Sequence, residues 1–470
     1  MLFAGKQGNF EPGINLKGAP FILGGHPFVG SARLFGLGQF GDVGIVDPGR
    51  DFLPLGQGMN ALVSVRSHDI EVAHRRQKVQ VPVTPVTPTR VIKSIQGDFL
   101  ESNYLGHILT GFLGYFLAFF ISYIPLERLR KYVVPFYLCT LISLLLIYFF
   151  GISVSGAQRW LNLGIFSFQP SEVAKLSTVL TLALVLDKKI ILTIRDLVLP
   201  LLVVVIPWLL IFFQPDLGTS LVLLVLTGVM LYWSQMPIEW ILILVFCIIT
   251  SILYLTLPTL LIFWIPFIGY LAYRSSKKKI IFSAIAISFH LLVAKLTPIL
   301  WQYGLKEYQK DRLVLFLDPN RDPLGGGYHL IQSQIAIGSG GLFGTGLLQG
   351  KLTNLQFIPE QHTDFIFSAL GEELGFVGCT IVLFLFFFLI KKLINTATIA
   401  RTNFESLIVI GIASTFLFQI IINLFMTIGL GPVTGIPLPF MSYGRTSLVT
   451  NFISIGFVLS ILKRSRSLRS

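Results

Sequence analysis

Residues 364–390 read DFIFSALGEELGFVGCTIVLFLFFFLI, and Lys391 and Lys392 follow directly. From Phe376 to the two lysines this stretch carries no charged side chain and is dominated by Phe, Leu, Ile and Val. An apolar helix of this length is what crosses a hydrocarbon core about 30 Å thick. The stretch therefore predicts a membrane-spanning helix whose end is marked by a basic pair.

Composition extends this prediction to the whole chain. Of the 470 residues, 53% are hydrophobic and 13% are charged, whereas a soluble domain carries about 25% charged residues. These figures exclude a disordered chain, a coiled coil and an ordinary cytosolic enzyme. We predict an all-α polytopic membrane protein with about eleven transmembrane helices. The predicted spans are residues 106–124, 132–150, 168–186, 197–213, 217–233, 238–257, 259–273, 279–297, 364–390, 405–428 and 440–462.

The basic residues predict an orientation. Lys and Arg collect in alternate loops, for example around 128–131 and 274–279, and in the tail 463–470. Cytoplasmic loops carry such an excess, so the tail is expected inside and the long loop 298–363 outside the plasma (inner) membrane. The net charge of +13 then reflects topology and does not indicate nucleic acid. Three cysteines lie in apolar runs, without the spacing of a disulfide framework or a metal site.

The first 104 residues differ from the rest. They are rich in Gly and polar residues and contain no long apolar run, which predicts a poorly ordered extension before a transmembrane domain at 105–462. The short run 61–63 fits either a strand or no regular structure. Eleven spans that end inside must start outside, so either one span is miscounted or the first span is missing.

Two polar motifs precede the long loop. In the first, Arg159 beside Trp160 fits either an interfacial anchor or an anion binder, and Glu172 and Lys175 are three apart on one helix face and can pair. The pair fits structural packing about as well as a functional role. In the second motif, Asp216 follows a proline and either caps the next helix or lines a site.

The long loop and the following segments carry further candidates. Asp322 stands in a turn-forming segment rich in Asp, Pro and Gly, and a loop aspartate can act as a general base. The stretch 338–350 is rich in glycine and is expected to be flexible, but it lacks the spacing of a nucleotide-binding loop. His362 and Asp364 either cap a helix or bind phosphate or a divalent ion. A Pro/Gly-rich segment at 431–444 should line a cavity or lie buried in protein.

Several long motifs, in order, resemble those of the SEDS family (shape, elongation, division and sporulation), and most closely those of its rod-shape branch, in a cyanobacterial-type variant. The similarity covers about residues 94–462. The motifs are GAQRWLNLG (156–164), FQPSEVAKL (168–176), QPDLGTSLV (214–222), EYQKDRLVLFLDP (307–319), DPLGGGYHLIQSQIAIGSGG (322–341), FIPEQHTDFIFSALGEELG (357–375) and GIPLPFMSYG (435–444).

The resemblance implies a peptidoglycan glycosyltransferase that polymerises lipid II during cell elongation and works with a class B penicillin-binding protein, a transpeptidase. It implies that Asp322 is the catalytic carboxylate and that Glu172 and Lys175 are the family's Glu/Lys pair. The substrate-binding residues expected from the motifs are Arg159, Glu172, Lys175, Asp216, Gln332, His362, Asp364, Ser442 and Tyr443. Arg159 and Lys175 are the hypothetical partners of the diphosphate leaving group, acting with or without Mg²⁺ or Mn²⁺, and membrane lipids are expected neighbours.

Two other functions use the same residues. A lipid II flippase would need the cavity and its charges but no base. A non-catalytic scaffold would only recruit the transpeptidase. An ion-coupled transporter fits less well, because the polar motifs cluster on one side of the membrane and not at the midplane of inverted repeats.

Overall fold

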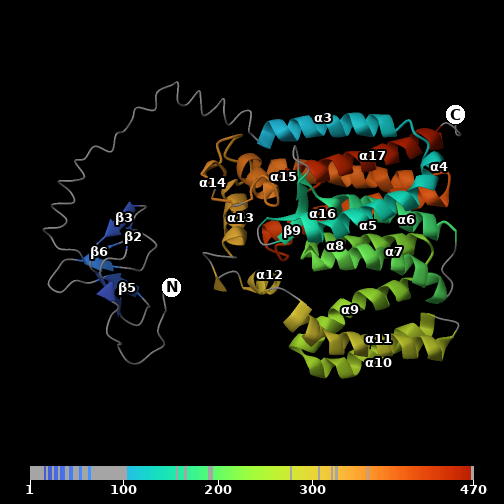
Figure 1. Cartoon of the computed structure of the whole chain (residues 1–470), viewed down its shortest axis with the longest axis horizontal. Coiled ribbons are helices and arrows are strands. Elements are labelled where there is room, and N and C mark those ends of the chain that lie inside the picture. Colours follow the sequence, from blue (N-terminus) through green and yellow to red (C-terminus); the bar gives the residue numbers. More distant parts are fainter. Residues whose placement is uncertain are drawn as a thin grey trace. The chain divides into compact units, whose positions relative to one another are not determined.

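A computed structural model gives the arrangement of the chain (Figure 1). It describes residues 103–466 apart from 155–156, 163–166, 189–193, 276–277, 305–306, 319–320, 323–326, 356 and 359, and before residue 103 it describes seven short strands. The chain divides into two compact units, Met1–Asp98 and Phe99–Ser470. The predicted poor order of residues 1–104 concerns residues that mostly lie outside the described part, and it stays a prediction.

The first unit contains only strands among its described residues. β1 (Asn15–Leu16), β4 (Ala32–Leu37), β5 (Asp42–Ile45), β7 (Leu62–Ser64) and β6 (Phe52–Pro54) form a five-stranded sheet in that order, and β2 (Pro20–Leu23) pairs with β3 (His26–Val29). All pairs are antiparallel except β5 with β7, which aligns Ile45 with Val63. The run 61–63, which fitted either a strand or no regular structure, therefore largely falls in a strand.

The second unit is helical. Its long helices are α3 (Asn103–Ile121), α5 (Val133–Phe150), α6 (Pro170–Leu186), α7 (Ile194–Phe213), α8 (Leu217–Trp233), α9 (Ile238–Thr256), α10 (Leu261–Ser275), α11 (Lys279–Ile299), α15 (Ile366–Ile399), α16 (Asn403–Ile428) and α17 (Arg445–Arg466). The shorter elements are α4 (Leu126–Leu129), η1 (Arg130–Tyr132), η2 (Pro258–Leu260), η3 (Leu300–Gly304), α12 (Glu307–Leu317), α13 (Tyr328–Ser339) and α14 (Lys351–Asn354). A small antiparallel sheet, in the order β10 (Ser167–Phe168), β9 (Ala157–Asn162) and β8 (Gly151–Val154), was not predicted from the sequence.

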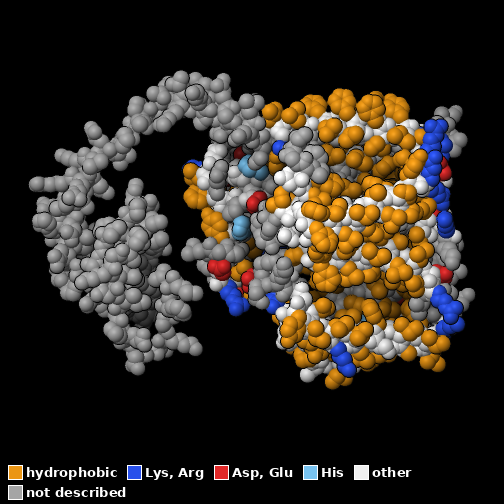
Figure 2. Space-filling view, in the orientation of Figure 1, with side chains coloured by type: hydrophobic (Ala, Val, Ile, Leu, Met, Phe, Trp, Pro, Cys, Tyr) orange, Lys and Arg blue, Asp and Glu red, His pale blue; other side chains and the backbone are white. Residues whose placement is uncertain are grey.

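Each predicted span coincides with one of the eleven long helices. Among the described residues, seven helical segments are long and apolar enough to cross a membrane, and the segments Leu105–Ile121 and Leu217–Trp233 are shorter apolar helices. The protein is therefore an all-α, multi-pass membrane protein. Figure 2 shows apolar side chains covering the visible sides of the helices, and many Lys and Arg side chains at the end of the bundle opposite α13 and α14.

Two predicted spans needed correction. The span predicted as one helix over 364–390 is broken at Gly375, which has φ 64° and ψ −163°. The span predicted from residue 440 starts only at Arg445, because residues 431–439, rich in Pro and Gly, have no regular structure and proline cannot donate the backbone hydrogen bond that a helix needs.

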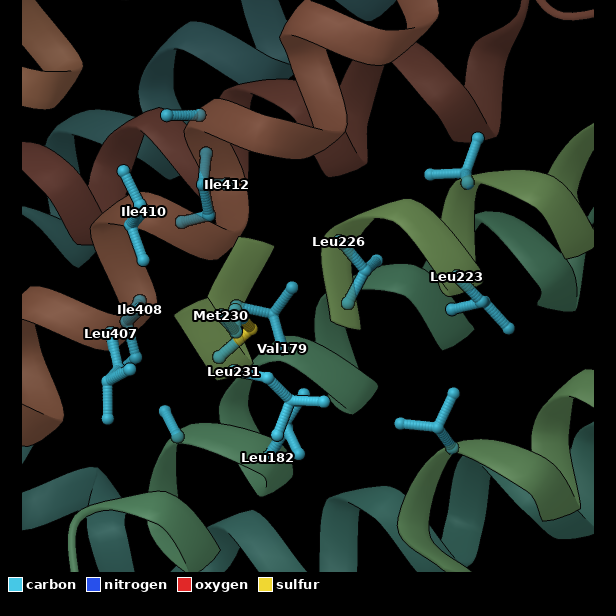
Figure 3. Packing of buried hydrophobic residues seen from close by; sticks show 14 of the residues in the cluster. Val179, Leu182, Leu223, Leu226, Met230, Leu231, Leu407, Ile408, Ile410 and Ile412 are labelled. Atoms are coloured by element: carbon cyan, nitrogen blue, oxygen red, sulfur yellow. The ribbon is translucent and has the colours of Figure 1, made fainter. Parts of the chain in front are cut away.

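The bundle is held together around α16. Figure 3 shows Val179 and Leu182 of α6, Leu223, Leu226, Met230 and Leu231 of α8, and Leu407, Ile408, Ile410 and Ile412 of α16. The backbone of Gly411 approaches this cluster so closely that a Cβ atom there would lie 2.7 Å from Val179 Cγ1 and 2.8 Å from Met230 Sδ. Close approach at a small residue is how helices pack in a membrane, where lipid offers no hydrophobic driving force between helices.

The long loop 298–363 is folded against one end of the bundle. Its glycine-rich stretch, expected to be flexible, is fixed to α15 by backbone hydrogen bonds at the break. Phe376 N and Val377 N donate to Gly341 O and Leu342 O, and Thr345 N and Gly346 N donate to Glu372 O and Glu373 O, over 2.9–3.1 Å. The broken helix and the loop thus satisfy each other's backbone groups, as a membrane protein requires.

Candidate active site

A cavity of about 920 Å³ opens at the end of the bundle that carries α12 and α13. Its walls come from β9, the first turns of α6 and α8, α12, α13 and the segments 360–365 and 433–447. The charged side chains that line it are Arg159, Glu172, Asp216, Lys310, Asp311, Arg312, Arg321, Asp322, Glu360 and Asp364. Trp160, Trp301, Leu315, Phe316, Leu330 and Phe365 add apolar surface. The cavity therefore combines charged groups of both signs with apolar surface, as a site for an amphipathic ligand does.

Arg159 lies on β9 and faces Asp216. Its Nη1 is 3.7 Å from Asp216 Oδ1, and its Nη2 donates to the backbone oxygen of Pro215. Its Nε is buried and has no hydrogen-bond partner within the described part of the chain. A buried donor of this kind costs free energy unless a ligand or water satisfies it. Both interpretations of Arg159, an interfacial anchor and an anion binder, stay predictions.

Asp216 caps α8 and also lines the cavity, and its role in binding stays a prediction. It is the N-cap of α8, where Oδ1 accepts from Thr219 N at 3.2 Å and Oδ2 accepts from Thr219 Oγ1 at 2.9 Å. Ser171 at the start of α6 donates to the same Oδ2 at 3.3 Å. The cap orients Asp216, and Asp216 in turn holds Arg159 at the cavity wall.

Glu172 and Lys175 form the predicted pair. Lys175 Nζ lies 2.8 Å from both carboxylate oxygens of Glu172, and both side chains are buried. Glu172 lines the cavity, whereas Lys175 lines a separate small pocket between α6, α16 and α17. Lys175 is thus placed to neutralise Glu172 and not to contact a ligand in the cavity.

Replacing Lys175 with methionine is expected to destabilise the protein by about 3–5 kcal/mol, because the carboxylate of Glu172 would be left buried without its partner. Thermal unfolding in detergent measures the effect. The double variant Glu172→Gln, Lys175→Met removes both charges and should regain most of the lost stability. Equal instability of the single and double variants would contradict a role in charge compensation.

Asp364 lies in a turn that three contacts hold against the segment 436–443. Asn423 Nδ2 donates to Asp364 O at 2.9 Å and to Ile436 O at 2.8 Å, and Ser442 Oγ donates to Thr363 O at 2.6 Å. Burial, and then the nearby Glu360 carboxylate, raise the pKa of Asp364 to about 6, although Arg312 and Arg159 act in the opposite direction. The carboxylate lines the cavity and is not a helix cap, because the N-cap of α15 is Phe365, without a side-chain cap.

The raised pKa of Asp364 predicts a stability that depends on pH. An acid whose pKa is higher in the folded state than in the unfolded state contributes to stability while it is protonated. For Asp364 this contribution is complete below about pH 4 and is lost as the pH rises through about 6. Asp364→Asn is therefore expected to raise the melting temperature at pH 7.5 and to lose most of that gain at pH 4.5. If the substitution lowered the melting temperature by the same amount at both pH values, ionisation of Asp364 would not destabilise the folded protein as expected.

Asp322 lies at the solvent-exposed part of the cavity lining. Its backbone oxygen accepts a hydrogen bond from Gly327 N at 3.0 Å. On α13, His329 stacks on Phe365 with ring centroids 6.0 Å apart. Burial lowers the pKa of His329, so its imidazole is neutral at neutral pH. Asp322 is one of three exposed carboxylates that line the cavity, together with Asp311 and Glu360.

The structure brings together six of the ten predicted site residues: Arg159, Glu172, Asp216, Asp322, Asp364 and Tyr443 line the cavity. It places four outside the lining: Lys175, Gln332, His362 and Ser442. Ser442 and the backbone of His362 connect the two turns beside the cavity, since Tyr443 N donates to His362 O at 2.8 Å. The roles of all ten residues in catalysis and binding stay predictions.

Six further charged or histidine residues of the cavity were not singled out from the sequence: Lys310, Asp311, Arg312, Arg321, His329 and Glu360. All but Arg321 stand in a motif that was quoted, so the motif was the available signal. Sequence spacing does not tell which side chain of a loop points inward, and the sequence therefore could not separate these residues from their neighbours.

The cavity does not resemble a metal centre. Among the described residues, no group of three or more His, Cys, Asp or Glu side chains is arranged to hold a metal ion. The carboxylates Asp216 and Asp364 interact instead with arginines. No catalytic step is therefore assigned to a metal, and the expected Mg²⁺ or Mn²⁺ stays a prediction.

Comparisons with known proteins agree with the sequence motifs. Residues 91–265 and 256–467 match the FtsW/RodA/SpoVE family, described as cell cycle proteins. The chain is 35% identical to the peptidoglycan glycosyltransferase MrdB of Escherichia coli K12 over 74% of this chain and 82% of that protein. It is 34% identical to the peptidoglycan glycosyltransferase RodA of Treponema pallidum over 78% of this chain and 92% of that protein.

Solved structures share the fold. A chain from a peptidoglycan synthase complex that coordinates polymerization and crosslinking is 31% identical, with a TM-score of 0.57 over 77% of this chain and 89% of that chain. A variant of the rod shape determining protein RodA of Thermus thermophilus is 26% identical, with a TM-score of 0.50 over 76% of this chain and 87% of that chain. The chain therefore belongs to the SEDS family of peptidoglycan glycosyltransferases, and within it resembles RodA and MrdB.

Proposed function

We propose that this glycosyltransferase polymerises lipid II into glycan strands during cell elongation, with its cavity at the extracytoplasmic face of the plasma membrane. The observation that carries the proposal is the cavity itself, which combines an exposed carboxylate, partly buried arginines and apolar walls at one end of a membrane bundle. A polyprenyl diphosphate sugar needs all three: a base for its acceptor, cations for its diphosphate and apolar surface for its lipid.

Asp322 is the proposed general base. Its carboxylate takes the proton from a sugar hydroxyl of the acceptor as the hydroxyl oxygen attacks the anomeric carbon of the donor. The new bond from carbon to oxygen forms as the bond from the anomeric carbon to the diphosphate oxygen breaks, and the diphosphate leaves with the electron pair. One base and one displacement invert the anomeric carbon, and no covalent intermediate is needed.

Arg159 is the proposed partner of the leaving diphosphate. Its buried Nε lacks a hydrogen-bond partner among the described residues, and its position is fixed by Asp216 and Pro215. Arg312 of α12 also lines the cavity and lies close to Asp364, because a Cβ atom at Gly435 would be 3.9 Å from Arg312 Nη1 and 3.3 Å from Asp364 Oδ2. Fixed cations that face a developing negative charge are usually a large catalytic contribution.

The topology supports the extracytoplasmic location. Exposed Lys391 and Lys392 end the apolar part of α15, and the last turns of α17 carry Lys463, Arg464 and Arg466, which is typical of the cytoplasmic side. The cavity lies at the other end of the bundle (Figure 1). The proposal also includes eleven membrane-spanning helices and a C-terminus on the cytoplasmic side.

A class B penicillin-binding protein is the proposed partner. The similar chain of known structure comes from a complex that coordinates polymerization with crosslinking. A polymerase that releases strands at the outer face of the membrane needs a transpeptidase there to crosslink them.

The decisive experiment is polymerisation of lipid II by the purified full-length protein in proteoliposomes, with the strands resolved on a gel. Strands are expected, and more of them with the partner transpeptidase present. Transfer of lipid II across the bilayer without strands would instead support the flippase. Absence of both activities, with the transpeptidase still bound, would support the scaffold.

A further inference from the structure

The loop that follows α13 exposes large apolar side chains outside the membrane-spanning helices. We call residues 340–350 the apolar loop. Phe343 is 81% exposed, Leu348 is 73% exposed, and Leu342 and Leu347 are also exposed. Exposed apolar residues that stand singly are normal, but a cluster of this kind marks an interaction surface. Figure 2 shows apolar side chains at the end of the molecule that carries α13 and α14.

The apolar loop is attached to α15 at a defined depth. Its backbone is bonded to α15 at the break, where Gly341 O and Leu342 O accept from Phe376 N and Val377 N. From position 376 to the exposed lysine at 391 a helix rises about 22 Å, at about 1.5 Å per residue. Since the hydrocarbon core is about 30 Å thick, a lysine pair at one membrane border places Phe376 within the opposite leaflet.

The apolar loop continues a surface of α15 that faces lipid. On α15, Phe376, Phe384 and Phe387 are more than 60% exposed, and lipid is what covers such side chains on a membrane-spanning helix. Part of the loop backbone is also hydrogen-bonded, as a membrane environment requires. Its carbonyl and amide groups pair with the backbone groups of α15 next to the break at Gly375. Leu342 and Phe343 therefore extend the lipid-facing surface of α15 beyond the helix.

From this geometry we propose that the apolar loop inserts into the headgroup and acyl-chain boundary of the leaflet next to the cavity, with Leu342, Phe343, Leu347 and Leu348 in contact with lipid acyl chains. The loop is joined to α13, whose first residues His329 and Leu330 line the cavity. Insertion would therefore hold that wall of the cavity at the lipid surface. The inference rests on the loop geometry and does not depend on the proposed lipid II activity.

A fluorescent NBD label on a Phe343→Cys variant tests the insertion. The full-length protein is placed in lipid nanodiscs, with the three native cysteines replaced as Cys139→Ser, Cys247→Ser and Cys379→Ala. The emission is expected to shift to the blue and to be quenched by lipids that carry a doxyl group near the headgroup end of the chain. Quenching by doxyl near the chain terminus should be weaker, because interfacial groups enter only about 5–10 Å.

The same label on an Asp318→Cys variant is the matched control. Asp318 is exposed on the same long loop and does not line the cavity, so its label should be quenched by aqueous iodide and not by doxyl lipid. Equal iodide quenching at both positions would overturn the proposal. If the label at position 343 were open to water in nanodiscs and became shielded only after the transpeptidase was added, this surface would bind a protein partner instead of lipid.

Discussion

Polymerisation of lipid II is expected to fall by at least about 100-fold when Asp322 is replaced by alanine, because a positioned general base contributes about 10²–10⁴-fold to a rate. Asp322 is exposed at the cavity, and alanine keeps the backbone oxygen that accepts a hydrogen bond from Gly327 N. The substitution should therefore leave the melting temperature and the binding of the transpeptidase close to those of the unchanged protein. Gel-resolved strand formation with purified protein measures the loss.

Asp318→Ala is the control for this experiment. Asp318 is an exposed aspartate of the same loop that does not line the cavity, and its removal should leave most of the activity. A change in activity that is equal for the two variants would mean that the loop contributes only its charge. Full activity of Asp322→Ala would remove the proposed base from the mechanism.

Replacing Gly375 with valine is expected to prevent correct folding. Gly375 has φ 64° and ψ −163°, a conformation that is open essentially to glycine alone and costs other residues about 1–3 kcal/mol. A Cβ atom at this position would also lie 2.3 Å from Gly344 N and 2.8 Å from Leu342 O, both of them backbone atoms that cannot move aside cheaply. The yield of folded protein after detergent extraction, and its melting temperature, should both fall sharply.

Gly338→Ala is the matched control, since a Cβ atom at Gly338 meets nothing within 4 Å. Gly338 lies in α13, where alanine is the better helix former by about 1 kcal/mol. This variant should be at least as stable as the unchanged protein. If Gly375→Val were equally stable, the attachment of the apolar loop to the break in α15 would not be essential to the fold.

The sequence allowed much of the fold to be predicted because the bilayer restricts what the chain can do. A long apolar segment in lipid must satisfy its own backbone hydrogen bonds, so a run such as 376–390 can only be a helix. For this reason the eleven long helices coincide with the predicted spans. The break at Gly375 was not visible, because a single glycine inside an apolar pattern is compatible with a continuous helix and only its contacts with Gly344 and Leu342 distinguish the two.

The candidate site also has features that the sequence predicted and features that it could not predict. The motifs predicted which segments carry chemistry, and the spacing of Glu172 and Lys175 predicted their pairing, because residues three apart on a helix are neighbours. Whether a side chain faces the cavity depends on contacts between distant segments. Ser442 looks like a binding residue in its motif, yet its hydroxyl group holds the turn at Thr363.

What the sequence by itself determined was the membrane class, the helices, the family and the set of polar segments, since these follow from local composition and short spacings. Only the tertiary structure decided that Arg159 meets Asp216, that Lys175 lies behind the cavity wall and that the apolar loop is bonded to α15. The physical reason is that these contacts join residues far apart in the chain, and the packing of several helices fixes their geometry together.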